Sequence, residues 1–427
     1  MNNGELFFIF RNLTIFFAGL MLVKYFIFLM VAPFHGVKEE MRKMRLKKID
    51  ARRQGIPYEP KISVIVPAWN EEVGILKTVR SVLANSYPNI DLNVINDGST
   101  DSTDAVMREF LKSAEFQKIS DRYPRKTVKY FKKRNGGKGK ALNYGINHSN
   151  GEIVITIDAD SAIAPDALAN MVRYFEDPKI DAAVGQVRID KNPSIFGLIQ
   201  KLEYAFGFYH KRAHSVMGAE YIFGGACAAF RRKTTFDEFG LYDTENKTED
   251  IEMSMRCRYF GKNSVYAENV LCYTEGPSDL VGLINQRLRW KKGRIDTFIK
   301  YRNLFFSRKD HHNRYLAWMV LPYSLLSEFH LSFEPIGFTL LITYSILTGD
   351  YLSLAIGVLF IFVMYMVVGL FSHDGVNLRI MLLFPLTWPL FYLLVWVEYI
   401  VLLRSVVMLL RGEEIEWQKW NRKGVQI

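Results

Sequence analysis

The chain contains very little cysteine. Cys227, Cys257 and Cys272 are the three cysteines among 427 residues, and no two of them have C-x-x-C spacing. An odd number of cysteines without that spacing argues against a disulfide framework and against a cysteine-type zinc site. We therefore expect the central part of the chain to lie in a reducing compartment.

Two common phosphate-binding signatures are also missing. No G-x-G-x-x-G follows the first predicted strand, 61–67, which argues against a nicotinamide-dependent oxidoreductase. The glycine-rich loop 135–140 is not a Walker A loop, because Arg134 stands five residues before Gly139 and Ala141 follows Lys140. A nucleotide pocket in this chain would have to be of another kind.

Apolar residues gather at the two ends of the chain. One apolar segment runs from about residue 6 to 32, and further spans are predicted near 316–347, 351–371 and 380–410. About 20 apolar residues are enough to cross a bilayer core. We therefore expect a multi-pass protein of the cell (plasma) membrane, with one N-terminal span and about three C-terminal ones.

The formal net charge of +11 is concentrated in two basic runs. Residues 38–53 carry eight Lys and Arg and residues 287–314 carry ten, and each run adjoins an apolar segment. The positive-inside bias places both runs, and the domain between them, in the cytosol. Juxtamembrane charge accounts for the basic excess, so nucleic acid is not an expected partner.

Several ionisable residues lie within the C-terminal apolar stretches. Such groups either line a polar path through a helix bundle or lie at the membrane interface. They are Glu328, His330, Glu334, Glu398 and Arg404.

The polar middle of the chain alternates between strand and helix patterns. Strands are predicted at 61–67, 91–96, 128–131 and 153–157, and helices at 71–85, 101–110 and 140–147. This alternation predicts an α/β fold with a mainly parallel sheet. Ligands of such sheets bind beyond the carboxyl ends of the strands, so Asp97 and the Asp158/Asp160 pair should converge there.

Two longer amphipathic stretches, 195–214 and 280–306, mix apolar and basic residues. Basic amphipathic helices next to membrane spans tend to lie in the plane of the lipid headgroups. The alternative is that both are ordinary surface helices packed on the sheet.

Carboxylates at strand ends indicate metal and nucleotide binding. Asp158 and Asp160 follow an apolar strand, and Mg²⁺ or Mn²⁺ readily shares such carboxylates with substrate phosphates. Asp97 precedes a Gly-Ser turn, where its side chain could bond the edge of a uracil base above a floor of Pro67 and Ala68. Lys138 and Lys140 either reach phosphates or belong to a solvated loop.

Two later motifs indicate transfer chemistry. Asp250, in Thr248-Glu249-Asp250, is a candidate general base for a sugar hydroxyl, although acidic residues also favour the start of a helix. Gln286 and Arg289 share a helix face at i, i+3 spacing. Arg289 can hold a diphosphate and Trp290 can stack on a sugar ring.

Together with 64–71 and 135–143, these clusters resemble the family 2 glycosyltransferases, specifically the membrane-integrated processive β-glycan synthases. Among these the chain looks most like poly-N-acetylglucosamine synthases, with hyaluronan, chitin and cellulose synthases as relatives. The resemblance implies a GT-A fold, a UDP-sugar donor, a growing glycan acceptor, an inverting reaction and Mg²⁺ or Mn²⁺.

The resemblance also implies roles for individual residues. Donor-binding residues would be Pro67, Ala68, Glu71, Asp97, Lys138, Lys140, Asp158, Gln286 and Arg289. Asp158 and Asp160 would hold the metal and Asp250 would be catalytic. Acceptor-binding residues would be Gly225, Cys227, Glu249 and Trp290. Trp417, Trp420 and Arg422 loosely resemble a gating tail.

The expected organisation has six parts: an N-terminal transmembrane helix at 1–35, a basic linker at 36–56, a GT-A domain at 57–277, interface helices at 278–314, C-terminal transmembrane helices at 315–411 and a tail at 412–427. The expected function is elongation of a polysaccharide from UDP-N-acetylglucosamine, with translocation across the bilayer. An accessory membrane subunit is among the expected partners. A non-processive enzyme making a glycolipid, and a hyaluronan- or cellulose-type synthase using another UDP-sugar, remain open alternatives.

Overall fold

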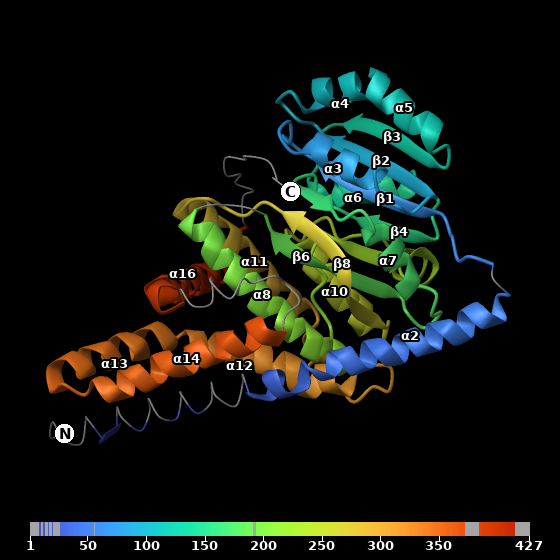
Figure 1. The fold of residues 1–427 in the computed structure, drawn as a ribbon. Coiled ribbons are helices and arrows are strands. Elements are labelled where there is room, and N and C mark those ends of the chain that lie inside the picture. The colour runs from blue at the N-terminus through green and yellow to red at the C-terminus, as the bar shows by residue number, and fades with distance from the viewer. Residues whose placement is uncertain are drawn as a thin grey trace.

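The computed structural model describes residues 26–54, 56–190, 194–371 and 384–414, together with the isolated positions 8, 9, 12, 16 and 19. Most of the expected N-terminal span therefore lies outside the described residues, as do Trp417, Trp420 and Arg422 of the expected gating tail. Figure 1 shows an α/β body from which a group of long helices extends.

The centre of the body is an eight-stranded sheet in the order β3-β2-β1-β4-β7-β6-β8-β5. The first four strands of that order are parallel to one another, whereas β7 is antiparallel to both of its neighbours and β5 is antiparallel to β8. The strands are β1 (Ile62–Ala68), β2 (Ile90–Asp97), β3 (Lys126–Lys133), β4 (Ile153–Thr156), β5 (Ser161–Ile163), β6 (Ala182–Ile189), β7 (Ala228–Arg231) and β8 (Ser264–Thr274). This mainly parallel, GT-A-like sheet confirms the predicted fold of the middle domain.

Helices between the strands cover the two faces of the sheet. They are α3 (Ile75–Leu83), α4 (Thr103–Lys112), α5 (Ala114–Arg122), α6 (Lys138–Asn147), α7 (Ala167–Tyr174), the short α9 (Phe236–Phe239) and α10 (Glu249–Tyr259). The predictions for 71–85, 101–110 and 140–147 are confirmed with small shifts at their ends. Helix α5 was not predicted from its polar sequence.

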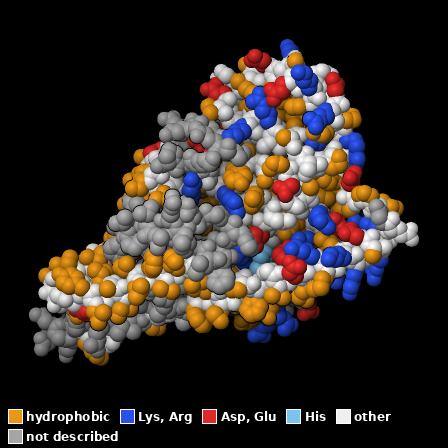
Figure 2. Space-filling view, in the orientation of Figure 1, with side chains coloured by type: hydrophobic (Ala, Val, Ile, Leu, Met, Phe, Trp, Pro, Cys, Tyr) orange, Lys and Arg blue, Asp and Glu red, His pale blue; other side chains and the backbone are white. Residues whose placement is uncertain are grey.

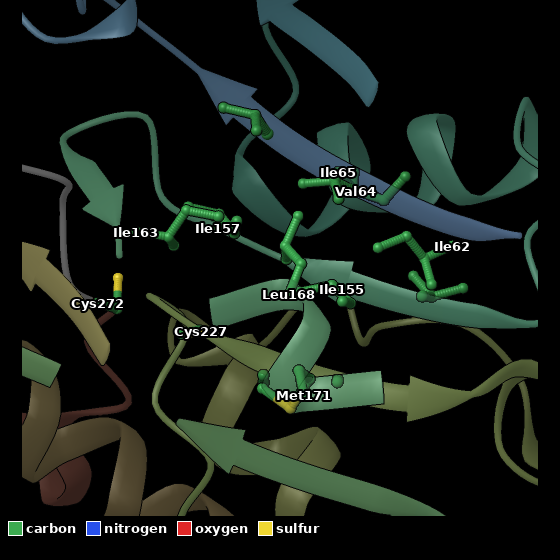
Figure 3. Close-up of a cluster of buried hydrophobic side chains, with 14 of the residues drawn as sticks. Ile62, Val64, Ile65, Ile155, Ile157, Ile163, Leu168, Met171, Cys227 and Cys272 are labelled. Carbon is green, nitrogen blue, oxygen red and sulfur yellow. The ribbon is translucent and has the colours of Figure 1, made fainter. Parts of the chain in front are cut away.

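The sheet forms because its central strands β1 and β4 are apolar on both faces. Ile62, Val64 and Ile65 of β1 and Ile155 of β4 are fully buried, and Figure 3 shows them packed together. Continuous apolar runs of this kind are typical of parallel strands covered by helices on both sides. The resulting rigid core fixes the strand ends at which the polar clusters stand.

A second group of helices lies beside the sheet. Helices α8 (Ile195–Val216) and α11 (Leu280–Lys300) run between the sheet and the apolar helices, and α2 (Phe34–Arg52) runs along the body (Figure 1). The apolar helices are α12 (Leu321–Leu331), α13 (Glu334–Thr348), α14 (Tyr351–Phe371) and α16 (Phe384–Arg411).

The apolar helices leave large side chains exposed. Leu347 is 79% and Leu352 70% exposed, and Figure 2 shows hydrophobic side chains covering this projection. Within the described residues, Tyr392–Arg411 is long and apolar enough to cross a membrane. The pair 316–331 and 334–348, bent by 47°, would be a second span if it forms one unit.

Candidate active site

The loops after β1 and β2 are fastened together by hydrogen bonds. Asn70 has a positive φ of 53°, donates its backbone N–H to Ser99 Oγ at 2.9 Å, and accepts the Thr100 N–H at 2.8 Å. Ser99 N–H in turn donates to Asn96 Oδ1 at 2.8 Å. The two loops therefore form one rigid wall next to Pro67 and Ala68, the residues expected at the pocket floor.

Asp97 ends β2 and is held by the glycine-rich loop. Its carboxylate accepts the backbone N–H groups of Gly136, at 3.1 and 3.2 Å, and of Gly137, at 2.8 Å, and it also pairs with Lys133. Asp97 is 3% exposed. In this structure its carboxylate organises the 135–137 loop, a role that the sequence pattern did not suggest.

Gly98, directly after Asp97, has a φ of +71°, and an added Cβ would lie 2.6 Å from the Asn135 backbone nitrogen. This position therefore requires glycine for two reasons, the left-handed backbone and the close approach of the loop.

Lys138 stands at the centre of a carboxylate cluster. Its Nζ lies 2.6 Å from Asp158 Oδ1 and 3.0 Å from Glu249 Oε1. An added Cβ on Gly225 would lie 2.8 Å from Lys138 Nζ, 3.2 Å from Asp250 Oδ2 and 3.7 Å from Asp158 Oδ1. Three clusters that are far apart in the sequence thus meet around one point next to Gly225.

The cluster changes the ionisation of its members. Burial lowers the pKa of Lys138, but the charges of Asp158, Glu249 and Asp250 outweigh burial, so the pKa of Lys138 is raised above its ordinary value. Burial, and then the neighbouring Asp250, raise the pKa of Glu249, while Lys138 opposes them. Lys138 therefore remains a cation and is the charge that offsets the buried acids.

Asp158 and Asp160 leave the sheet just after β4, where the sequence placed them. The Asp158 side chain is 29% exposed, and Asp160 Oδ1 accepts the Ser161 hydroxyl at 3.1 Å. Hard oxygen donors at an open position suit Mg²⁺ or Mn²⁺, which are usually shared between one or two carboxylates and substrate phosphates. Among the described residues no group of three or more His, Cys, Asp or Glu forms a metal cage, so the phosphates would have to complete the coordination.

Asp250 is oriented by two backbone groups. Its Oδ2 accepts the Gly225 N–H at 2.8 Å and its Oδ1 accepts the Ile251 N–H at 2.9 Å. The carboxylate is half-buried in the first turn of α10, one residue after the buried Glu249. The residue begins a helix, as one reading of this motif expected, and its carboxylate faces the cluster, where its role as a general base stays a prediction.

The expected acceptor loop 223–227 divides between site and core. Gly225 borders the cluster, whereas the Cys227 side chain is 1% exposed and points into the hydrophobic core near Cys272 (Figure 3). An added Cβ on Gly185 would lie 3.0 Å from Cys227 Sγ, so the thiol packs against the backbone of β6. For Cys227 the structure therefore supports a packing role.

Helix α11 carries Gln286, Arg289 and Trp290, and the Trp290 ring lies against the Arg287 guanidinium, whose central carbon is 4.9 Å from the ring centroid. Gln286 is 6% exposed, and its Oε1 atom has no hydrogen-bond partner among the described residues. Burial raises the pKa of Tyr204, and the charges of Arg287, Glu203, Asp160 and Arg289 act on the same hydroxyl in decreasing order. Tyr204 therefore lies between the α11 cations and the carboxylate that follows β4.

Close packing joins α11 to the loop before α10. An added Cβ on Gly293 would lie 2.1 Å from Thr248 Oγ1. One turn further along, Thr297 Oγ1 accepts the Asn246 side-chain amide at 3.1 Å. The helix that carries Arg289 thus also fixes the residues leading into Glu249 and Asp250.

The remaining predicted residues are near these clusters or at their edge. Glu71 is 7% exposed and donates its backbone N–H to Thr103 Oγ1 at 2.8 Å. Lys140 is exposed on the first turn of α6, away from the Lys138 cluster. Sequence reasoning missed Lys133 and Gly293, because their roles depend on contacts between distant segments.

Comparisons with known proteins agree with this geometry. Residues 60–293 match the family described as "Glycosyltransferase like family 2". The chain is 34% identical over 242 residues to a poly-beta-1,6-N-acetyl-D-glucosamine synthase of Staphylococcus epidermidis and 31% identical over 242 residues to one of Staphylococcus aureus (strain COL). Each alignment covers 56% of both proteins, so the chain spans about half the length of the curated relatives it matches.

A solved structure has a similar fold. It is a mannosyltransferase from Pyrobaculum calidifontis, determined in complex with GDP-Man and Mn²⁺. The TM-score is 0.56 at 19% sequence identity, and the match covers 91% of this chain and 99% of that one.

Proposed function

The chain belongs to the glycosyltransferase-like family 2, and on this premise we propose that it elongates a polysaccharide by inverting, processive transfer of N-acetylglucosamine from UDP-N-acetylglucosamine. The observation that carries the proposal is the meeting of Lys138, Asp158 and Asp250 around Gly225, beside a helix that also contacts the apolar helices. The names of the similar staphylococcal synthases support the choice of sugar.

The reaction would be a single displacement. Asp250 takes the proton of the acceptor hydroxyl, the hydroxyl oxygen bonds to the anomeric carbon, and the bond from that carbon to the diphosphate breaks. Its two backbone hydrogen bonds hold the Asp250 carboxylate in one orientation for this task. Gly225 leaves room for the acceptor, because it has no side chain at the point where the three groups converge.

The donor would lie across the strand ends. Its uridine would bind at the wall of Pro67, Ala68 and the 97–100 loop, with Glu71 nearby. Asp158 and Asp160 would hold Mg²⁺ or Mn²⁺, which neutralises charge on the departing diphosphate. Arg289 would contact the diphosphate, and Gln286 would supply its buried, unpartnered oxygen to the donor or to the acceptor hydroxyls.

The membrane arrangement is part of the proposal. Helices α12, α13, α14 and α16 and the N-terminal segment would form a multi-pass bundle, with the catalytic domain in the cytosol and α8 and α11 at the bilayer interface. The six-part division into 1–35, 36–56, 57–277, 278–314, 315–411 and 412–427 belongs to the same proposal. A product chain would leave the site through or along this bundle.

The test is sugar transfer by the purified full chain in lipid nanodiscs. The chain is incubated with individual UDP-sugars and Mg²⁺ or Mn²⁺, and both UDP release and product length are measured. We expect UDP-N-acetylglucosamine to give the fastest UDP release and a long polymer. A single transfer to lipid would favour the glycolipid alternative, and preference for another UDP-sugar would overturn the choice of donor.

A further inference from the structure

Helix α11 has a second polar stripe. Besides Gln286, Arg289 and Trp290 it carries Arg287, Lys291 and Arg294, whose i, i+4, i+7 spacing places them on one face. Arg287 is 6% and Lys291 5% exposed. Buried cations on this scale need carboxylate partners, because removing a charge from water is costly.

Each of these cations has such a partner. The Arg287 guanidinium grips Glu203 with two contacts, Nη1 to Oε1 at 2.5 Å and Nη2 to Oε2 at 2.6 Å. Lys291 Nζ lies 2.9 Å from Glu328 Oε2 and 2.9 Å from Glu398 Oε2. These contacts join α11 to carboxylates on three other helices.

Two more contacts close the network. Arg294 pairs with Glu328, and Arg287 Nη1 lies 3.6 Å from Glu398 Oε1. Three cations thus face three carboxylates, one each from α8, α12 and α16. The network has three positive and three negative groups. Every ion pair joins α11 to one of the helices α8, α12 and α16.

The acceptor side of the site is fastened to the same apolar helices. The Tyr221 hydroxyl lies 2.9 Å from Ser324 Oγ on α12. Tyr221 precedes the 223–227 loop, whose Gly225 N–H orients Asp250. Helix α12 therefore contacts both α11 and the segment that leads to the acceptor loop.

From this arrangement we infer that Glu203, Glu328 and Glu398 are positioning residues for sugar transfer. They hold α11 by its Arg287/Lys291/Arg294 face, and so fix the depth and rotation at which Gln286, Arg289 and Trp290 meet the substrates. The Trp290 ring is also in direct contact with this face, because the central carbon of the Arg287 guanidinium lies 4.9 Å from its centroid. The inference rests on the proposed function, since it assigns Arg289 and Trp290 to the reaction. Under this inference Glu328 and Glu398, which the sequence alone allowed to line a polar path through a helix bundle, instead hold α11 in position.

The physical reason is the precision that transfer requires. Both faces belong to one helix, so a shift or rotation at Lys291 moves Arg289 and Trp290 by a similar amount. A misplacement of about 1 Å far from the reacting atoms can lower a rate by on the order of 100-fold. The uridine wall is built on β1 and β2 and would not move with α11.

The test uses Glu203→Gln and Glu398→Gln in the full chain, with Glu334→Gln as the matched control. Glu334 pairs with His330 at 3.5 Å within the bent α12–α13 pair and not with a cation of α11. For the two network variants we expect kcat to fall on the order of 100-fold, UDP affinity to stay near that of the unmodified chain, and backbone amides of α11 to exchange hydrogen faster. The control should change none of these.

Unchanged kcat in both network variants would overturn the inference, as would faster exchange of α11 without any fall in kcat. If a Gln variant does not fold, Glu203→Asp decides, because it keeps the charge but shortens the reach to Arg287. A lower kcat with UDP binding intact then supports the positioning role, and an unchanged kcat refutes it. An unmodified chain that transfers no sugar would instead overturn the proposed function, and the exchange of α11 would still report whether the carboxylates hold the helix.

Discussion

The two halves of the sheet build their parts of the site by different means. On the β3-β2-β1-β4 side, Asp97 ends β2 and the Asp158/Asp160 pair follows β4, and the Asp97 carboxylate is held by the Gly136 and Gly137 N–H groups of the next loop. On the β7-β6-β8-β5 side, the working residues come from α10, α11 and a loop, and contacts between distant segments hold them, as the Gly225 N–H holds Asp250 and Gly293 packs against Thr248. Substitutions in the first half should therefore mainly weaken nucleotide binding, and substitutions in the second half should mainly lower the rate of sugar transfer.

The sharpest test of the second half is Asp250→Asn. The amide keeps the shape of the side chain but cannot accept the acceptor proton, so we expect kcat to fall by about 10³-fold. UDP binding, measured by calorimetry, should remain. Robust turnover by this variant would show that Asp250 is not the general base. It would also contradict the proposal that residues of the second half set the rate.

Gly293→Ala tests whether packing sets the rate. The new Cβ would lie 2.1 Å from Thr248 Oγ1, so either α11 or the segment leading to Asp250 must move. We expect a fall in kcat of about 100-fold and a loss in stability of about 1–3 kcal/mol. Gly207→Ala in α8 is the control, because nothing lies within 4 Å of its added Cβ.

Lys138→Met removes the cation that joins Asp158, which follows β4, to Glu249 on α10. Losing a charge-assisted contact of about 2 kcal/mol should lower transfer about 30-fold. It also removes the cation that opposes the raised pKa of Glu249, so that pKa should rise further. An acid whose pKa is higher in the folded than in the unfolded state loses stabilisation as pH rises through its folded pKa.

The Lys138→Met variant should therefore lose thermal stability more steeply than the unmodified chain as pH rises above the ordinary pKa of a glutamate and through the raised pKa of Glu249. Thermal melts across that range are the measurement. Parallel pH profiles for the two proteins would show that Lys138 does not offset Glu249.

Gly98→Ala tests the first half, with the smallest expected effect on chemistry. The positive φ and the approach to the Asn135 backbone nitrogen predict about 1–2 kcal/mol of strain, which corresponds to about tenfold weaker UDP binding. The kcat at saturating donor should change little. A variant that loses kcat but binds UDP normally would contradict the contrast between the halves.

This contrast also explains what could be predicted from the sequence. Consecutive βα units put Asp97 at the end of β2 and Asp158 and Asp160 after β4, the two strands on either side of β1, so the strand pattern predicts that all three lie at the carboxyl edge of the sheet. Cys227 was misplaced, because a motif does not show which of its side chains turns into the core. The partners of Lys133 and Arg287 were missed, because ion pairs between residues more than 30 apart leave no periodic signal.

The edges of the sheet have a consequence for the protein in solution. An edge strand offers unpaired backbone groups to any second chain, and lysines or short length reduce that hazard. The β3 edge carries Lys126, Lys129, Lys132 and Lys133 within eight residues, and the opposite edge, β5, has three residues in all. Neither edge is a good template for aggregation, so the α/β body is protected against edge-to-edge pairing with a second chain.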